Sequence, residues 1–386
     1  MTAAQQLLLC VSRPAIDNEN KERVQQLLRR GVNWEYLIST AVRHGVIPLL
    51  HYHLWNITNG EVPSDLTSFL EQETQKNTAR GLLLTGELLT LLRAFQKHGI
   101  EAVPWKGPTL AAVAYGDVGL REFRDLDLFV RREDMPRVNE ILSQIGFGPS
   151  PDVTKSLDAA LLRFDCARLF SNDRIFADLH WACSPPNLSL TLKPDMDRLQ
   201  PVNLGPLQTV TLSQEDLLIA LSIHGLTHYW ERLAWVADVG ALIARNEIDW
   251  DLLMTKARQL GLSRVVAVAV LLAHELLDVS LRIELIRFLK ADRVAVKLSG
   301  TFQHAMFEYP RRPTSAISVI KLHLNIRERL RDKVLTIMRM ALTPRLADLQ
   351  TISLPAELHA IYYLVRPARL CIKYSLSLTR RVFGAS

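Results

Sequence analysis

Residues 125–130 read Asp-Leu-Asp-Leu-Phe-Val, an apolar run in which two carboxylates stand two positions apart. The apolar and aromatic residues of this run predict a largely buried strand. Residues i and i+2 of a strand point to the same side, so Asp125 and Asp127 should emerge together, with Cα atoms about 6.6 Å apart. Two like charges side by side repel each other and need a cation, and hard oxygen ligands suit Mg²⁺ or Mn²⁺.

The elements around this strand predict a small α/β unit over residues 97–183. Residues 100–105 are apolar and end at Lys106-Gly107-Pro108, which is typical of a strand, a tight turn and a helix with proline in its first turn. Residues 136–145 predict a helix that ends at Gly146, and residues 175–181 predict a third strand. Strands that alternate with helices in this way indicate an α/β core with a small mixed sheet.

Helical periodicity dominates the rest of the chain, so the predicted fold class is α+β and mostly α-helical, with the core embedded between helical regions. We expect an N-terminal helical region over residues 1–96 and a helical substrate-side domain over 213–285, opened by a capping box at Ser213. A basic helical region is expected over 286–386. The proline-rich connection, residues 184–212, should lack regular elements because prolines interrupt it at five positions. These prolines are Pro185, Pro186, Pro194, Pro201 and Pro206.

Composition favours a soluble protein with a packed core. Of the 386 residues, 48% are hydrophobic and 22% charged, which excludes a disordered chain. The longest apolar run, residues 265–273, is about half the roughly twenty residues that a membrane span needs. No basic patch followed by a long apolar segment opens the chain, and the four cysteines form no CxxC pair. We therefore expect a cytoplasmic protein with reduced thiols; the sequence does not indicate an oligomeric state.

The net charge of +6 is concentrated near the C-terminus. Residues 282–345 hold 14 Lys and Arg against 5 Asp and Glu, and five further basic residues follow Glu357 without an acid. Such a region could contact nucleic acid or an anionic surface, although a basic helical face is more often simply solvated.

Asp178 offers a third carboxylate, on the strand predicted over residues 175–181, and its side chain should share a face with Phe176 and His180. Three acids from two neighbouring strands could hold two metal ions about 4 Å apart, the arrangement that serves phosphoryl and nucleotidyl transfer. Lys106 and Gly107 at the turn are suited to an anion, because glycine allows its close approach and the backbone N–H groups of a helix start attract it.

Two further groups of residues are candidates for the site. Arg121 and Arg124 precede the paired acids and could clamp a triphosphate, or they could form ion pairs with Glu122 or with the acids themselves. His224 and His228 are four apart on one helical face and could line a cleft on the substrate side. The other residues expected on that side are His180, Trp230, Trp235 and Asp238.

Zinc is poorly supported at the two histidines, because Gly225 stands where an HExxH site has its Glu and no third ligand is evident. They should instead contact substrate or satisfy structural hydrogen bonds. His180 with Cys183 is a single half-motif that suggests a structural role. Walker A, GxGxxG and GxSxG motifs are absent from the sequence, which excludes those enzyme classes.

The order of these motifs resembles the nucleotidyltransferase superfamily that includes the catalytic core of DNA polymerase beta, and more narrowly its family of uncharacterised bacterial nucleotidyltransferases. The resemblance spans about residues 30–262. Its landmarks are residues 105–107, 115–117, 121, 125–130, 178–181 and 224–230, followed by Trp235 and Asp238. The chain departs from the superfamily in having Gly107-Pro108 where Gly-Gly or Gly-Ser is usual, and Thr227 where Lys is common.

The resemblance implies a metal-dependent transfer of a nucleoside monophosphate from an NTP such as ATP, with Mg²⁺ or Mn²⁺ as cofactor. Asp125 and Asp127 would bind both ions, and Asp178 would complete the second ion's site and activate the acceptor. Lys106, Gly107, Arg121 and Arg124 would bind the nucleotide. The acceptor is expected to be a small molecule, a peptide or a sugar. The alternatives are an RNA or tRNA acceptor held by the basic C-terminal region, or a non-catalytic protein that binds a nucleotide or a partner.

Overall fold

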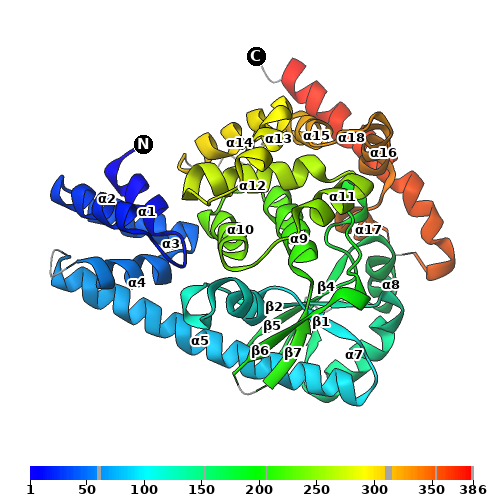
Figure 1. Ribbon diagram of the computed structural model, residues 1–386. Helices are drawn as coiled ribbons and strands as arrows, with labels where there is room; N and C mark the ends of the chain where they lie inside the picture. The colour runs from blue at the N-terminus through cyan, green and yellow to red at the C-terminus, as the bar shows by residue number, and fades with distance from the viewer. Residues whose placement is uncertain (59–61, 151–153, 206, 309–314, 353, 384–386) are drawn as a thin grey trace.

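The computed structural model describes residues 1–58, 62–150, 154–205, 207–308, 315–352 and 354–383. A small mixed sheet lies at one end of a mostly helical molecule (Figure 1). Within these residues the strand order of the sheet is β1-β2-β5-β4-β3; β2 and β5 are parallel and the other neighbours are antiparallel. The strands are β1 (Ala102–Pro104), β2 (Asp125–Val130), β3 (Gly148–Pro149), β4 (Ala167–Ser171) and β5 (Phe176–His180).

The two faces of the sheet have different partners. Leu126, Leu128 and Val130 of β2 are buried with Leu84, Leu88 and Phe95 of the long helix α5 (Ser64–Lys97) and with residues of α7 (Met135–Gln144). Phe129 belongs instead to the larger helical core, as does Trp105. Successive side chains of β2 therefore point to opposite faces of the sheet. The even-numbered residues pack against α5 and α7, and the odd-numbered ones, including both aspartates, face the helical part of the molecule.

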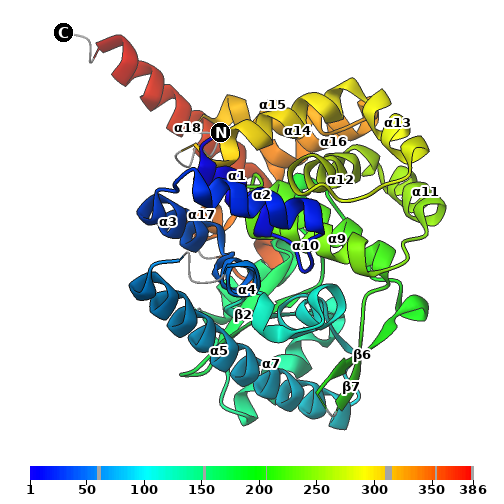
Figure 2. The same cartoon turned by 60° about the vertical axis from the view of Figure 1, so that its left-hand side comes forward.

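Apart from one two-stranded hairpin, the other regular elements of the described chain are helices (Figures 1 and 2). Before the sheet lie α1 (Ala3–Val11), α2 (Asn18–Arg29), α3 (Trp34–His44) and α4 (Ile47–Ile57). Between the strands lie α6 (Gly107–Leu110) with the helical turns η1 (Ala111–Tyr115) and η2 (Val118–Leu120), then η3 (Arg132–Asp134) and α8 (Lys155–Phe164). After the sheet come η4 (Pro186–Leu188), η5 (Met196–Arg198), α9 (Gln214–Thr227), α10 (Leu233–Arg245), α11 (Trp250–Leu260) and α12 (Ser263–Leu277).

The C-terminal region packs on the outside of these helices. It comprises α13 (Ile283–Ala291), α14 (Arg293–Met306), α15 (Ala316–Asn325), α16 (Leu330–Leu342), α17 (Leu346–Leu349), η6 (Ala356–Ile361) and α18 (Tyr362–Phe383). The last helix, α18, runs outward from the body (Figure 2). In the described part of the chain, none of the helices combines the length and apolar character that crossing a bilayer would require.

The expectation that the proline-rich connection lacks regular elements is wrong. A two-stranded hairpin, β6 (Gln200–Leu204) and β7 (Leu207–Thr211), lies within it, and the Thr211 hydroxyl donates to the Pro104 carbonyl of β1 at 2.7 Å. Pro201 lies inside β6, where a ribbon of only two strands leaves positions at which no N–H is needed. The fifth proline, Pro206, is outside the described residues.

Candidate functional site

The site is built on the two parallel strands β2 and β5. Asp127 is the register partner of Asp178, and Phe129 is the partner of His180. Directly opposed residues of neighbouring strands face the same side of a sheet, so these side chains project together toward the helical core. The alternation of apolar and polar residues in both strands produces this arrangement, since Ala177 and Leu179 fill the opposite face.

Asp127 lies at the centre of the site and is 5% exposed. Its Oδ1 atom lies 2.6 Å from Lys106 Nζ and 3.0 Å from His180 Nε2. Burial alone would raise the pKa of Asp127, but Lys106 and His180 outweigh that effect and hold the pKa well below its usual range. The carboxylate is therefore ionised, and two basic side chains supply the cationic charge that the clustered acids need.

His180 joins the two aspartates. Its Nε2 atom lies 3.3 Å from Asp178 Oδ2, and ligand-type atoms of Asp127, Asp178 and His180 all lie within 4.8 Å of one another. Burial lowers the pKa of His180, but the carboxylates of Asp178 and Asp127 raise it well above the ordinary value. The sequence predicts that His180 shares a strand face with Asp178 and lies on the substrate side, but it does not predict the contact of His180 with Asp127.

Asp125 begins β2 at the exposed mouth of the site and is not part of this three-residue group. Partial desolvation raises the pKa of Asp125, and the Asp127 carboxylate raises it further while Lys106 lowers it. Asp125 is thus close enough for the charges of Asp127 and Lys106 to shift its pKa. Of the three expected acids, Asp127 and Asp178 form a group with His180 in the structure, and Asp125 lies next to that group.

The turn at Lys106 and Gly107 places the lysine over the site. Gly107 has φ +56°, a backbone conformation that favours glycine, and a Cβ there would lie 3.3 Å from the Asp125 carbonyl oxygen. The Lys106 ammonium reaches Asp127 and also lies 4.5 Å from the centre of the Trp105 ring. Pro108 occupies the first turn of α6, where a missing N–H costs little.

Arg121 is held by Asp238 of α10 and not by Glu122 or the paired acids. Its Nε and Nη2 atoms donate to the two carboxylate oxygens at 2.8 and 2.9 Å, and the Tyr115 hydroxyl donates to Asp238 at 2.9 Å. Asp238 is 2% exposed. It was expected on the substrate side, but its oxygens accept these bonds from Arg121 and Tyr115, so it orients Arg121.

Arg124, in contrast, is exposed and lines a separate cavity of about 470 Å³ together with Arg43 and Arg232. These two arginines come from α3 and from the end of the α9–α10 connection. Glu231 and Glu308 line the same cavity, so its wall carries charges of both signs.

The histidines of α9 lie against the site. The His224 ring is 6.3 Å from Trp105 and 4.6 Å from His228, and both histidines contact Trp235. Desolvation lowers the pKa of His224 well below its ordinary value, and the charge of Lys106 adds to this effect. Neither histidine belongs to a metal-ligating group among the described residues.

Trp230 is almost fully buried, and it also lines the cavity that Arg124, Arg43 and Arg232 share. Tyr229 and Trp230 have φ angles of 59° and 51°, so the chain reverses at the end of α9 and α10 begins only at Leu233. The Trp230 ring folds back onto Gly225 and is 1% exposed. Gly225 therefore stands in the histidine motif because the Trp230 ring occupies the space of its side chain.

Gly225→Ala should destabilise the protein by about 1–3 kcal/mol, because a Cβ there would lie 2.4–2.5 Å from the rigid Trp230 ring. The matched control is Gly86→Ala on the exposed face of helix α5, where nothing outside the helix lies within 4 Å of the added Cβ. That change should stabilise the protein by up to about 1 kcal/mol. Urea denaturation measures the free energy of unfolding of both variants. If the two changes shifted it equally and in the same direction, the packing of Trp230 on Gly225 would be contradicted.

Comparison with known proteins adds one match. A family model described as uncharacterised nucleotidyltransferase matches residues 30–278, which is more than half of the chain. The matched range contains the sheet, both aspartate strands, the turn at Gly107 and helices α9 and α10. Curated proteins gave no significant match to the sequence.

Proposed function

The chain belongs to this family of uncharacterised nucleotidyltransferases, and we propose that it transfers a nucleoside monophosphate from an NTP to an acceptor hydroxyl. The observation that carries the proposal is the pairing of Asp127 with Asp178 across parallel strands, with His180 completing a group within 4.8 Å. The acceptor oxygen forms a bond to the α-phosphorus, the bond from that phosphorus to the β-phosphate oxygen breaks, and pyrophosphate leaves with the electron pair.

The residues of the site fit a divalent metal ion. Two carboxylates and an imidazole form the donor set, and carboxylate oxygens suit Mg²⁺ or Mn²⁺. Lys106 and His180 neutralise the buried, ionised Asp127, and a bound ion would take over part of that role, with His180 binding it after giving up its proton. When bound, the metal would neutralise charge on the NTP phosphates. Asp127, Asp178 and His180 would hold it, with Asp125 at the mouth as a further carboxylate ligand.

The neighbouring side chains have distinct proposed roles. Lys106, at the turn before α6, can move from Asp127 to a phosphate oxygen and stabilise charge on the departing pyrophosphate. Arg121, oriented by Asp238, presents its remaining nitrogen, Nη1, which has no hydrogen-bond partner within the described structure. Asp178 is 29% exposed and can accept the proton of the attacking hydroxyl. Arg124 is the remaining candidate contact for the triphosphate tail, although it lines a separate cavity that also contains Glu231 and Glu308.

The proposal is tested with α-labelled ATP, GTP, CTP and UTP, each incubated with Mn²⁺, the purified protein and a cell extract. We expect label from one NTP in a new product, together with an equal amount of pyrophosphate. Chelation of the metal should stop both. A protein that binds no NTP and releases no pyrophosphate with any of the four would contradict the proposed function.

Mn²⁺ binding provides a test that does not need the acceptor. Asp178→Asn should weaken binding of Mn²⁺, measured by electron paramagnetic resonance of the free ion, by at least about tenfold, because one of three ligand side chains loses its charge. Asp173→Asn is the matched control, since Asp173 is exposed just before the same strand. Equal Mn²⁺ affinity in the wild type and both variants would contradict the ligand assignment.

A further inference from the structure

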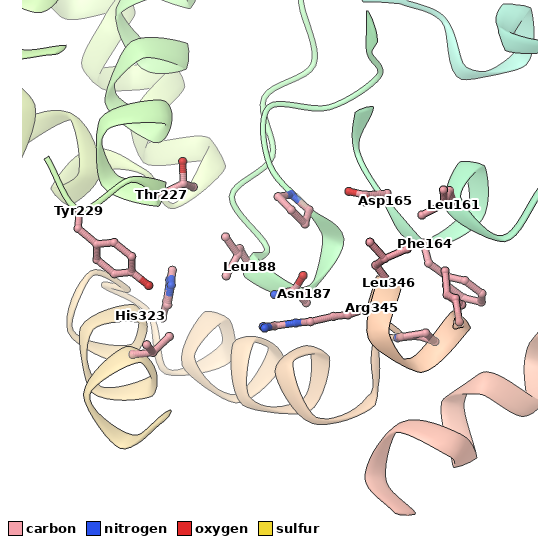
Figure 3. Close-up of a pocket in the computed structure, with 14 residues that line it drawn as sticks. Leu161, Phe164, Asp165, Asn187, Leu188, Thr227, Tyr229, His323, Arg345 and Leu346 are labelled. Carbon is pink, nitrogen blue, oxygen red and sulfur yellow. The ribbon is translucent and has the colours of Figure 1, made fainter. Parts of the chain in front are cut away.

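A cavity of about 320 Å³ lies where four parts of the chain meet, one of them the loop after β5 with Asn187 and Leu188 (Figure 3). Phe164 and Asp165 contribute from the end of α8, and Thr227 and Tyr229 from the end of α9. The third wall comes from the C-terminal region beyond the residues matched by the family model, and includes Val319 and Arg345. The cavity thus lies between elements inside the range matched by the family model and helices of the C-terminal region outside it.

The first wall continues the face of the sheet that carries the paired acids. Ala167 of β4 is the register partner of His180, and Asp165 lies two residues earlier in extended backbone, hence on the same side. The Trp181 indole donates to the Asp165 carbonyl at 2.9 Å. Burial raises the pKa of Asp165, its bond from the Cys166 N–H lowers it, and the Asp178 carboxylate is near enough to raise it further.

The second wall also lies close to the proposed catalytic site. Thr227 lies in the last turn of α9, where its hydroxyl donates to the His224 carbonyl at 2.9 Å. His224 contacts Trp105, and its pKa is lowered by the charge of Lys106 and raised by that of Asp127. The first wall therefore continues β4, the neighbour of strand β5, and the second wall ends the helix whose His224 contacts Trp105.

The arginines of the C-terminal region fix the third wall. The Arg327 guanidinium is 1% exposed and donates to the Leu188 carbonyl, and Arg339 donates to the Ser189 hydroxyl at 3.2 Å. Arg366 and Arg369 both bind the buried Asp348. Arg327 and Arg339 hold the region against the loop that follows β5, and Arg366 and Arg369 are engaged within the region itself.

The lining of the cavity indicates the chemistry of its occupant. Apolar side chains form much of it, and Asp165 and Arg345 place opposite charges along it, with the Arg345 side chain extending toward Asn187 (Figure 3). Burial, aided by the charges of Arg327 and Arg345, lowers the pKa of His323 to about 4, so this side chain is neutral at pH 7. A volume of about 320 Å³ lies at the small end of small-molecule sites.

We propose that this cavity binds the acceptor, and that the acceptor is a small hydroxyl-bearing molecule with a partly apolar body and one anionic group, a carboxylate or a phosphate. The anionic group faces Arg345, and the hydroxyl lies on the Asp165 side, toward Asp178. This inference rests on the nucleotidyl transfer proposed above. It replaces the RNA acceptor with a small molecule and gives the C-terminal region the role of closing the acceptor site.

The test fills the cavity without touching the catalytic residues. Val319→Trp places a large ring in the cavity from α15, and Ile317→Trp is the matched control on the same helix, where Ile317 is 77% exposed. Each protein is given Mn²⁺ and the four α-labelled NTPs with either the deproteinised, nuclease-treated fraction of a cell extract below about 1 kDa or the RNA of the same extract. Binding of Mn²⁺ and NTP is measured in parallel by calorimetry.

We expect the wild type and Ile317→Trp to label a product in the small-molecule fraction, and Val319→Trp to do so at least tenfold more slowly with unchanged Mn²⁺–NTP binding. Arg345→Gln should raise the KM for the acceptor fraction more than it lowers kcat. Label in RNA alone, or full activity of Val319→Trp, would overturn the cavity assignment while leaving nucleotidyl transfer intact. Loss of Mn²⁺–NTP binding in the wild type would instead refute the proposed function and this inference with it.

Discussion

Asp127→Asn should lower nucleotidyl transfer by at least about 10³-fold while the protein stays folded. Asp127 is the most buried member of the acid group, and its Oδ1 atom is the point where Lys106 and His180 meet. An amide keeps the shape but removes the charge that would hold the metal and orient both basic groups. A 10³-fold loss corresponds to about 4 kcal/mol of transition-state stabilisation, which is within the range expected of a metal-ion contribution.

The fold should survive this change because other acids remain beside the two basic groups. His180 Nε2 also lies 3.3 Å from Asp178, and the pKa of Asp125 already reflects the nearby charge of Lys106. Removing one of three neighbouring carboxylates also relieves repulsion. Circular dichroism and the thermal midpoint of unfolding check the fold, and Asp173→Asn controls for the loss of one exposed acid. Wild-type turnover in a folded Asp127→Asn protein would rule out the proposed role.

The strands that carry the site could be predicted because their sequences alternate strongly. Residues 125–130 form β2 as expected, and β5 lies within the range predicted for the third strand. In both, leucines or alanine fill one face and acids stand on the other, which is a period-2 signal that local sequence alone provides. The family resemblance rested on the same residues, and the family match includes them.

Strand β4 could not be predicted in the same way, because one of its buried positions is occupied by a charged residue. Arg168 is 7% exposed and lies 2.9 Å from Asp158 of α8, so a charged residue occupies a buried position of the strand. Sequence patterns assign such a residue to the surface. The local pattern also does not predict that the Trp230 ring packs onto Gly225, because two residues with positive φ reverse the chain after α9.

Contacts between residues far apart in the chain could also not be predicted from the sequence. Arg121 and Asp238 are separated by 117 positions, and nothing in the local pattern of either indicates its partner. The same holds for Lys106, whose pairing with Asp127 depends on how the turn before α6 lies over β2. Sequence spacing indicated which residues share a strand or helix face, whereas the partner of each charge follows from how the elements pack.

Asp238→Asn should lower the free energy of unfolding by about 3–5 kcal/mol. Arg121 would keep its charge in a place where it is only 11% exposed, and removal of one partner from a buried ion pair leaves that charge uncompensated. The Tyr115 hydroxyl would also lose an ionised acceptor. Asp173→Asn, an exposed change of the same kind, should shift stability by less than about 0.5 kcal/mol. Urea denaturation measures both.

A triple variant separates the structural role of this pair from its role in the site. Arg121→Met, Asp238→Leu and Tyr115→Phe together replace the polar cluster by apolar groups of similar size, and such replacements of buried ion pairs are often neutral or stabilising. Stability should therefore return to near the wild-type value. Transfer should not return, because the guanidinium proposed to contact the phosphates is gone, and the KM for NTP should rise. If the triple variant regained both stability and wild-type transfer, Arg121 would be structural only and Lys106 would be the remaining phosphate contact from the turn.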